Sequence, residues 1–231
     1  MKVIAHIEND YTEKFGIPRQ SGLNRALLSR IVMEPEYRIP EAFRGIEAYS
    51  HLWLIWAFSA VKEGASFSPT VRPPRLGGNT RVGVFATRSP FRPNRLGLSC
   101  VELIRLEQTA EGPVLIVAGA DLMNGTPIYD IKPYLPYADA HPDARINEAL
   151  SHKRLDVLFP DELKARLPKE KIAPLTELLA LDPRPAYQED PDRIYGLSFG
   201  PYNVRFRVQG EVLEVCEISG FSSSGMNQLS T

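Results

Sequence analysis

Residues 98–131 read LSCVELIRLEQTAEGPVLIVAGADLMNGTPIYDI. This stretch contains three runs of strand-forming residues: 98–106, 114–120 and 127–131. Turn-forming residues such as Asn124-Gly125 separate the runs, and each gap is too short to hold a helix. Strands that follow one another without intervening helices argue against a doubly wound parallel sheet. They predict a sheet that closes into a barrel or a sandwich.

The same pattern extends toward the N-terminus. Further predicted strands lie at 3–7, 30–33, 52–58 and 81–87. Residues 40–50 (PEAFRGIEAYS) predict one short helix, because a proline starts it and its apolar residues share a face. The N-terminal part, residues 1–138, is therefore expected to form one mainly β domain.

The composition changes at residues 133–145, where three prolines and small polar residues indicate a linker. Helical patterns follow at about 146–158, 160–167 and 172–181, and alternation over 203–218 around Gln209-Gly210 predicts a hairpin. We expect a second, small α+β domain at 143–220. The polar stretch 221–231 is expected to be a disordered tail.

Composition limits the function classes. The 231 residues are 43% hydrophobic and 24% charged, as in ordinary soluble proteins. The longest apolar run, 52–61, is too short to span a bilayer, and acidic residues near the N-terminus argue against a secretory signal. Two cysteines and four scattered histidines offer no disulfide framework and no metal-binding spacing. A cytoplasmic protein without a metal or a membrane role is expected.

Familiar catalytic motifs are missing. The sequence has no G-x-G-x-x-G after a strand, no P-loop and no G-x-S-x-G elbow. Ser50 and His51 are adjacent, and we expect them not to bond as nucleophile and base, because strand neighbours point to opposite faces. His51 is either a partly buried histidine or a ligand contact.

One segment is strongly cationic. Residues 64–101 contain six arginines and no aspartate, glutamate or lysine. The net charge of the whole chain is −1, so the residues outside this segment carry a net charge of −7. A polyanion is the natural partner of such a segment. Arginine without lysine indicates oriented phosphate or base contacts, because a guanidinium can bond in pairs and stack. The alternative is that individual arginines bridge carboxylates or line a solvated loop.

Five blocks, in order, carry a family resemblance: YTEKFGIPRQ, FRGIEAYSHLWLIWAF, PTVRPPRLGGNTRVGVFATRSPFRPNRLGLS, DLMNGTPIYDIKPYLPYAD and LDPRPAY. The chain resembles the TrmO (TsaA-like) family over about residues 3–208. These S-adenosylmethionine-dependent enzymes methylate N6 of threonylcarbamoyladenosine beside the anticodon of tRNA, at position 37. The resemblance implies a closed antiparallel β-barrel domain, unlike Rossmann methyltransferases, followed by a small domain, and it implies a homodimer.

The resemblance also implies the residues that bind the methyl donor. They are Pro18, Arg19, Gln20, His51, Leu52, Arg88, Leu98, Asp121, Leu122, Met123 and Asn124. A carboxylate such as Asp121 suits the donor's cationic groups, and Arg88 or Arg19 suits its carboxylate. Alternatively, these arginines only tie loops together, and Leu52 and Leu98 belong to the core.

The chain departs from the family pattern at two places. DLMNG has Asn124 where the family has an aspartate, which removes a charge but keeps an oxygen acceptor before a turn glycine. Asn94-Arg95-Leu96 adds a cation where proline and isoleucine are commoner. Donor affinity or substrate range could differ, while the reaction class is expected to be the same.

For the chemical step, a general base would be Asp130 or else Tyr134, although Asp130 could instead pair structurally with Lys132. The expected tRNA-binding residues are Arg72, Arg75, Arg81, Arg92, Arg95, Lys132, Tyr187 and Arg205. Tyr134, Tyr137 or Tyr187 could stack on splayed bases. Two rival functions remain: a non-catalytic RNA-binding barrel module, and a methyltransferase for another small acceptor.

Overall fold

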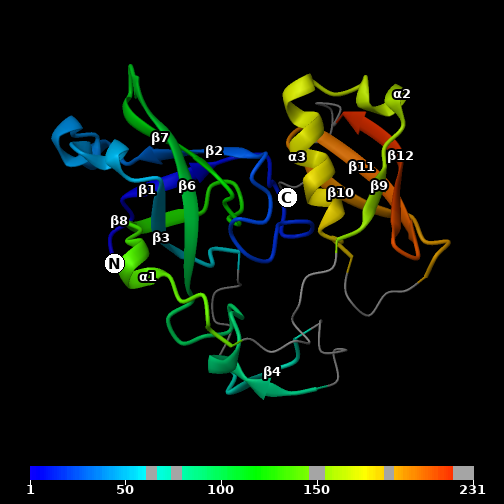
Figure 1. The fold of residues 1–231 in the computed structure, drawn as a ribbon, viewed down its shortest axis with the longest axis horizontal. Helices are drawn as coiled ribbons and strands as arrows, with labels where there is room; N and C mark the ends of the chain where they lie inside the picture. The colour runs from blue at the N-terminus through cyan, green and yellow to red at the C-terminus, as the bar shows by residue number, and fades with distance from the viewer. Residues whose placement is uncertain (61–66, 74–79, 146–153, 185–189, 221–231) are drawn as a thin grey trace, which may run out of the picture.

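The structure is a computed structural model, and it describes residues 1–60, 67–73, 80–145, 154–184 and 190–220. Most of the regular structure in these residues is β (Figure 1). Two sheets dominate, and a short two-stranded ribbon of β4 (Thr70–Val71) and β5 (Val82–Gly83) lies apart from them. In the described part of the chain, no helix is long and apolar enough to cross a membrane.

The larger sheet contains six strands, and every pairing in it is antiparallel. The strands are β1 (Ala5–Glu8), β2 (Leu28–Met33), β3 (His51–Ala57), β6 (Leu96–Thr109), β7 (Gly112–Ala118) and β8 (Pro127–Pro133). Their order is β1-β2-β7-β6-β3-β8, and β8 pairs back with β1, so the ring of strand pairs is closed.

Alternation in β3 explains how this sheet encloses a core. In HLWLIWA, Leu52, Leu54 and Trp56 are buried, whereas the residues between them are partly exposed. Side chains of the neighbouring strands meet the buried set in one hydrophobic cluster. The opposite face of β3 therefore remains available for polar and ligand contacts.

Six of the seven strands predicted from the sequence are confirmed, and the seventh is wrong. Of the predicted strand 81–87, only β5 is extended, and Val84–Ala86 forms a 3-10 turn. Arg92 Nη1 donates to the carbonyls of Val84 and Thr87 (3.1 and 2.7 Å), which closes the turn. These side-chain bonds override the local preference of valine and phenylalanine for a strand.

The helix predicted at 40–50 is also wrong as one element. The segment forms two 3-10 turns, Pro40–Phe43 and Ile46–Ala48, after an earlier one at Pro35–Tyr37. Gly45 lies between the two turns with φ +87°, a left-handed conformation that ends a right-handed helix.

The smaller sheet has the order β10-β11-β12-β9. Its strands are β9 (Asp156–Leu158), β10 (Tyr195–Phe199), β11 (Tyr202–Gln209) and β12 (Val212–Gly220). The α-helices of the described residues are α1 (Pro136–Asp139), which follows β8, and α2 (Asp161–Lys164) and α3 (Lys169–Ala180), which follow β9. The predicted hairpin is confirmed as β11–β12, with Gly210 at φ +59° in its turn. Helices predicted at 160–167 and 172–181 correspond to α2 and α3.

The helix predicted at 146–158 is wrong at its end, because residues 156–158 form β9, which pairs in parallel with β12. Residues 146–153 and the predicted tail at 221–231 lie outside the described residues. The pairing partner of β9 follows it by more than fifty positions, so no local pattern signals this strand.

The segment between β1 and β2 packs into the second core. Tyr11 and Leu27 are buried with residues of α3, β10, β11 and β12 in one hydrophobic cluster. Asn24 Nδ2 donates to Tyr11 Oη and to the carbonyl of Pro174 in α3, both at 3.0 Å. Figure 1 shows this blue segment lying between the larger sheet and α3. The loop that contains Pro18–Gln20 is therefore held by both parts of the molecule.

Candidate functional site

Two glycines bring the loop at residues 16–22 against the end of β7. The N–H of Gly22 donates to the carbonyl of Gly119 at 2.8 Å, and both residues have positive φ (+79° and +78°). A Cβ on Gly119 would lie 3.1 Å from the Cα of Gly22. Glycine is thus required for this close backbone approach, which brings the loop at 18–21 to the start of the DLMN segment.

Asp121 lies at the centre of the site and is partly buried. Ser99 Oγ donates to Asp121 Oδ1 at 2.5 Å, and Trp56 Nε1 donates to Ser99 Oγ at 2.9 Å. Burial raises the pKa of Asp121 to about 6, although the Ser99 bond, backbone N–H groups and the charge of Arg88 all lower it. The carboxyl is poorly solvated and would gain from a cationic ligand group.

Gly97 makes this arrangement possible. A Cβ at this position would lie 2.2 Å from the Trp56 ring, so any larger residue would displace the indole. Gly97 pairs with Trp56 across β6 and β3, and Ser99 follows two residues later on the same face of β6.

Arg88 meets the PRQ loop. Its guanidinium donates to Gln20 Oε1, and the Gln20 amide donates to the carbonyl of Arg19. Arg19 Nη2 donates to the carbonyl of Arg184 at 3.1 Å. The structure therefore brings Arg19, Gln20, Arg88 and Asp121 together from three separate stretches of sequence. Arg19 and Arg88 also connect loops to one another, which is the structural role that the sequence analysis gave as the alternative to donor binding.

The rest of the DLMN segment is fixed by Asn9. Asn9 Nδ2 donates to the carbonyl of Leu122 (3.0 Å), and the N–H of Asn9 donates to Asn124 Oδ1 (3.0 Å). Leu122 is fully buried, while Met123 is partly exposed and Asn124 is exposed. The side-chain oxygen of Asn124 thus serves the turn, a role that the family's aspartate could fill equally well.

Leu52 and Leu98 differ in their environment. Leu52 is 1% exposed and belongs to the core, whereas Leu98 is 56% exposed on the outer face of β6. The alternative that both leucines belong to the hydrophobic core is therefore correct for Leu52 and wrong for Leu98. Pro18, next to the arginine of the PRQ loop, is buried.

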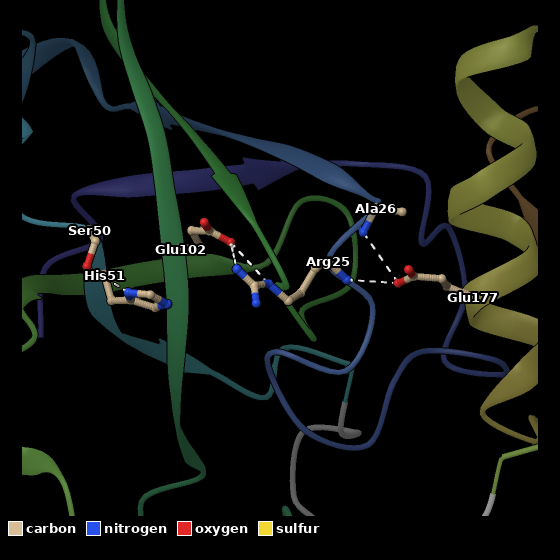
Figure 2. A network of polar contacts seen from close by, with 6 residues as sticks. All are labelled: Arg25, Ala26, Ser50, His51, Glu102 and Glu177. Carbon is tan, nitrogen blue, oxygen red and sulfur yellow. Dashed lines mark hydrogen bonds and ion pairs between the residues drawn. The ribbon is translucent and has the colours of Figure 1, made fainter.

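Ser50 and His51 correct an expectation. Ser50 Oγ and His51 Nδ1 are 3.0 Å apart, so the adjacent residues do bond (Figure 2). The alternation argument fails because Ser50 precedes β3 and lies in a bend. The Tyr134 ring lies 6.1 Å from that of His51 and 5.7 Å from that of Trp53, so the three rings share the outer side of β3.

The base candidate Asp130 is paired. Lys132 Nζ lies 2.8 Å from Asp130 Oδ2, and the N–H of Ile131 donates to Asp130 Oδ1 (2.9 Å). Both side chains of the ion pair are substantially exposed. Asp130 is the register partner of Ile55 in β3. The hydrogen bonds described above for Arg88 and Asp121 do not involve Asp130.

The predicted RNA-binding arginines have different surroundings. Arg72 is exposed, Arg81 Nη1 donates to Thr70 Oγ1 (3.1 Å), and Arg205 pairs with Glu217 (3.4 Å). Arg92 is bonded to two carbonyls, as described above, and Arg95 has φ +47°. Arg75 and Tyr187 lie outside the described residues.

A second polar network was not predicted from the sequence. Glu177 of α3 accepts bonds from the N–H groups of Arg25 (3.1 Å) and Ala26 (3.4 Å). The Arg25 guanidinium bonds Glu102 of β6, and Glu102 is the register partner of His51. Figure 2 shows this path from the helix to the outer face of the sheet. Its members are far apart in sequence, so only the fold reveals it.

Next to the site is a cavity of about 230 Å³ between the PRQ loop and the second part of the chain. Phe15, Pro18, Leu178 and Arg184 are among the residues that line it. In the described ranges, no three His, Cys, Asp or Glu side chains gather as a metal site would require.

These features define a class: a mainly β protein in which a partly buried carboxylate, a guanidinium and a cavity lie near one another, next to an arginine-rich segment. The chain belongs to the TrmO family. Residues 6–140 match the tRNA-methyltransferase O N-terminal domain, and residues 152–221 match the TrmO C-terminal domain.

Individual relatives agree. A tRNA (adenine(37)-N6)-methyltransferase of Escherichia coli is 44% identical over 92% of this chain and 94% of its own length. A putative S-adenosylmethionine-dependent methyltransferase of Pseudomonas aeruginosa, RcsF, is 38% identical over 94% and 96%. The crystal structure of TrmO from Pseudomonas aeruginosa superposes with a TM-score of 0.75 at 32% identity, covering 95% of this chain and 99% of that one.

Proposed function

We propose that this protein transfers the methyl group of S-adenosylmethionine to N6 of the adenine at position 37 of tRNA, with threonylcarbamoyladenosine as the acceptor nucleoside. Family membership over both parts of the chain supports the tRNA methyltransferase activity. The observation that carries the assignment in this molecule is the Asp121 carboxyl, partly buried and close to Arg88.

The residues present fit this donor. Asp121 would accept the donor's cationic groups, and their charge would replace the water that burial has removed from the carboxyl. Arg88, oriented by Gln20, would bind the donor carboxylate with two parallel bonds. Leu98, exposed on the outer face of β6, would offer the donor an apolar contact. The bound donor supplies a methyl group already activated on a positively charged sulfur.

The remaining work is alignment of the acceptor nitrogen and removal of one proton from it. Asp130 remains our first candidate for the proton acceptor, and Tyr134 our second. Asp130 is exposed to solvent, and its partner Lys132 would turn toward a phosphate of the bound RNA. Asp130→Asn should lower turnover far more than donor affinity. Equal turnover in a single-turnover assay would remove Asp130 from the mechanism.

The arginines of 64–101 would hold the anticodon-loop backbone, with Arg205 extending this surface. Residues 1–138 would form a donor-binding β-barrel domain and residues 143–220 a small α+β domain, in a cytoplasmic homodimer. The closed ring of strand pairs and the boundaries of the family matches support the two domains. The homodimer is proposed from the family resemblance alone.

Donor binding is the first test of this proposal. Calorimetric titration with S-adenosylmethionine should give one site per chain, lost in Asp121→Ala and strongly weakened in Arg88→Ala. The matched control is Arg105→Ala, because Arg105 pairs with Glu107 on β6 and is exposed. Wild-type protein that binds tRNA but no donor would favour the non-catalytic RNA-binding module instead.

A further inference from the structure

An aromatic cluster lies exposed within the arginine-rich segment. Phe85 is 72% exposed and Phe67 is 48% exposed. Their rings are stacked with centroids 6.3 Å apart and planes inclined by 27°. The Arg92 guanidinium carbon lies 5.6 Å from the Phe85 ring centroid, within cation–π distance.

The position of Phe85 is fixed by the turn that carries it. Its neighbour Val84 is 1% exposed and occupies the inward position, and the N–H of Val84 donates to the carbonyl of Pro69 at 3.0 Å. The carbonyl of Val84 accepts bonds from Thr87 Oγ1 (2.8 Å) and Arg92 Nη1 (3.1 Å). Phe85 therefore points outward while the backbone beside it is bonded, so its exposure is a property of the fold.

The charge around the cluster limits what could cover it. Across residues 67–73 and 80–101 the only charged side chains are arginines. The absence of carboxylates has no evident use in binding an apolar protein surface. It does favour an anionic chain, because carboxylates would repel it, and flat apolar groups on that chain would suit the aromatic rings. Unpaired nucleobases on a phosphate backbone have both properties, and bases stack on aromatic rings and guanidinium planes.

We propose that Phe67, Phe85 and Arg92 form a stacking platform for an unpaired base of the RNA substrate. The proposal rests on the proposed function, since it assigns to this cluster one part of tRNA recognition. Arg92 would act as a positioning residue, because its two carbonyl bonds fix the turn and its guanidinium lies over the ring. The stacking energy would come from the rings and would depend little on base identity.

The test uses an anticodon stem-loop with threonylcarbamoyladenosine and 2-aminopurine at an unpaired position of the loop. Binding to the wild-type protein should quench the 2-aminopurine fluorescence. Phe85→Leu keeps an apolar side chain without a π-face, and it should weaken binding roughly 10-fold and abolish the quench. Phe85→Trp should restore both. Tyr49→Leu, at a 39% exposed aromatic outside the segment, should behave as wild type.

The outcomes separate this proposal from the function itself. If Phe85→Leu binds and quenches like wild type, the platform is refuted while donor binding and methyl transfer can still stand. If Phe85→Leu instead changes the oligomeric state in sedimentation, the ring lies between two copies, which also overturns the proposal. If the wild-type protein binds no RNA, the proposed function fails, and the platform fails with it.

Discussion

The protonation of Asp121 should control donor binding. With a pKa of about 6, this carboxyl is largely protonated at pH 5 and ionised at pH 7. A cationic donor group binds the ionised form of the carboxyl. Because only roughly a tenth of the carboxyl is ionised one pH unit below its pKa, donor affinity should rise roughly 10-fold between pH 5 and 7. Calorimetry across this range measures it. Asp121→Asn lacks the titrating carboxyl and should lose this pH dependence.

Asp121 should also cost stability at neutral pH. Its folded-state pKa of about 6 lies above the ordinary 3.8, so between these values the folded protein retains a proton that the unfolded chain has lost. Stability therefore falls as pH rises from about 4 to 6, by on the order of 2–3 kcal/mol in total. Asp121→Asn should then be more stable than wild type at pH 7.5 but not at pH 3.5, as urea denaturation can show. A less stable variant at pH 7.5 would contradict this.

At the scale of elements, Gly97 in β6 connects the core with the site. Gly97→Ala would drive a methyl group into the Trp56 ring, and overpacking of this kind costs about 1–3 kcal/mol. Moving the indole would also remove its bond to Ser99, and with it the orientation of Asp121. We expect lower stability together with weaker donor binding. Gly83→Ala is the matched control, because a methyl group there would meet no atom within 4 Å, and φ at Gly83 is −59°.

The α3 helix should influence the donor site through Glu177. Glu177→Ala would leave the N–H groups of Arg25 and Ala26 without this acceptor and loosen the segment that leads from the PRQ loop into β2. We expect KM for the donor to rise several-fold while kcat changes little, since no reacting atom is touched. Glu177→Gln retains an acceptor oxygen and should restore most of the loss. A fall in kcat with unchanged KM would argue against a positioning role.

The elements that the sequence predicted well are those with local signals. A run of apolar and aromatic residues located β3, and alternation around Gln209-Gly210 located the β11–β12 hairpin. Predictions failed where contacts outside the local pattern decide the structure: β9 pairs with β12, which is far away in sequence, and the Arg92 side chain closes the 3-10 turn after β5. Within the site, the family motifs indicated Arg88 and Asp121. Ser99 was missed because its hydroxyl bonds Asp121 only once the fold has brought β6 next to the DLMN segment.

At the scale of the whole molecule, charge and packing are divided between two surfaces. Residues 64–101, which include most of the connection from β3 to β6, carry arginines without acidic residues, while the segment between β1 and β2 packs into the second core through Tyr11 and Leu27. The PRQ loop and the arginine-rich segment meet at the contact between Arg88 and Gln20. The architecture thus places the proposed donor site beside the segment proposed to hold tRNA.

The most direct measurement is methyl transfer from isotopically labelled S-adenosylmethionine to tRNA with or without threonylcarbamoyladenosine, read by nucleoside mass spectrometry. The account predicts one labelled methyl group on the modified nucleoside only, and none with Asp121→Ala. Equal labelling of both tRNAs would refute the acceptor assigned here. No label on either, from protein that binds the donor, would contradict tRNA methylation and direct the search to another acceptor.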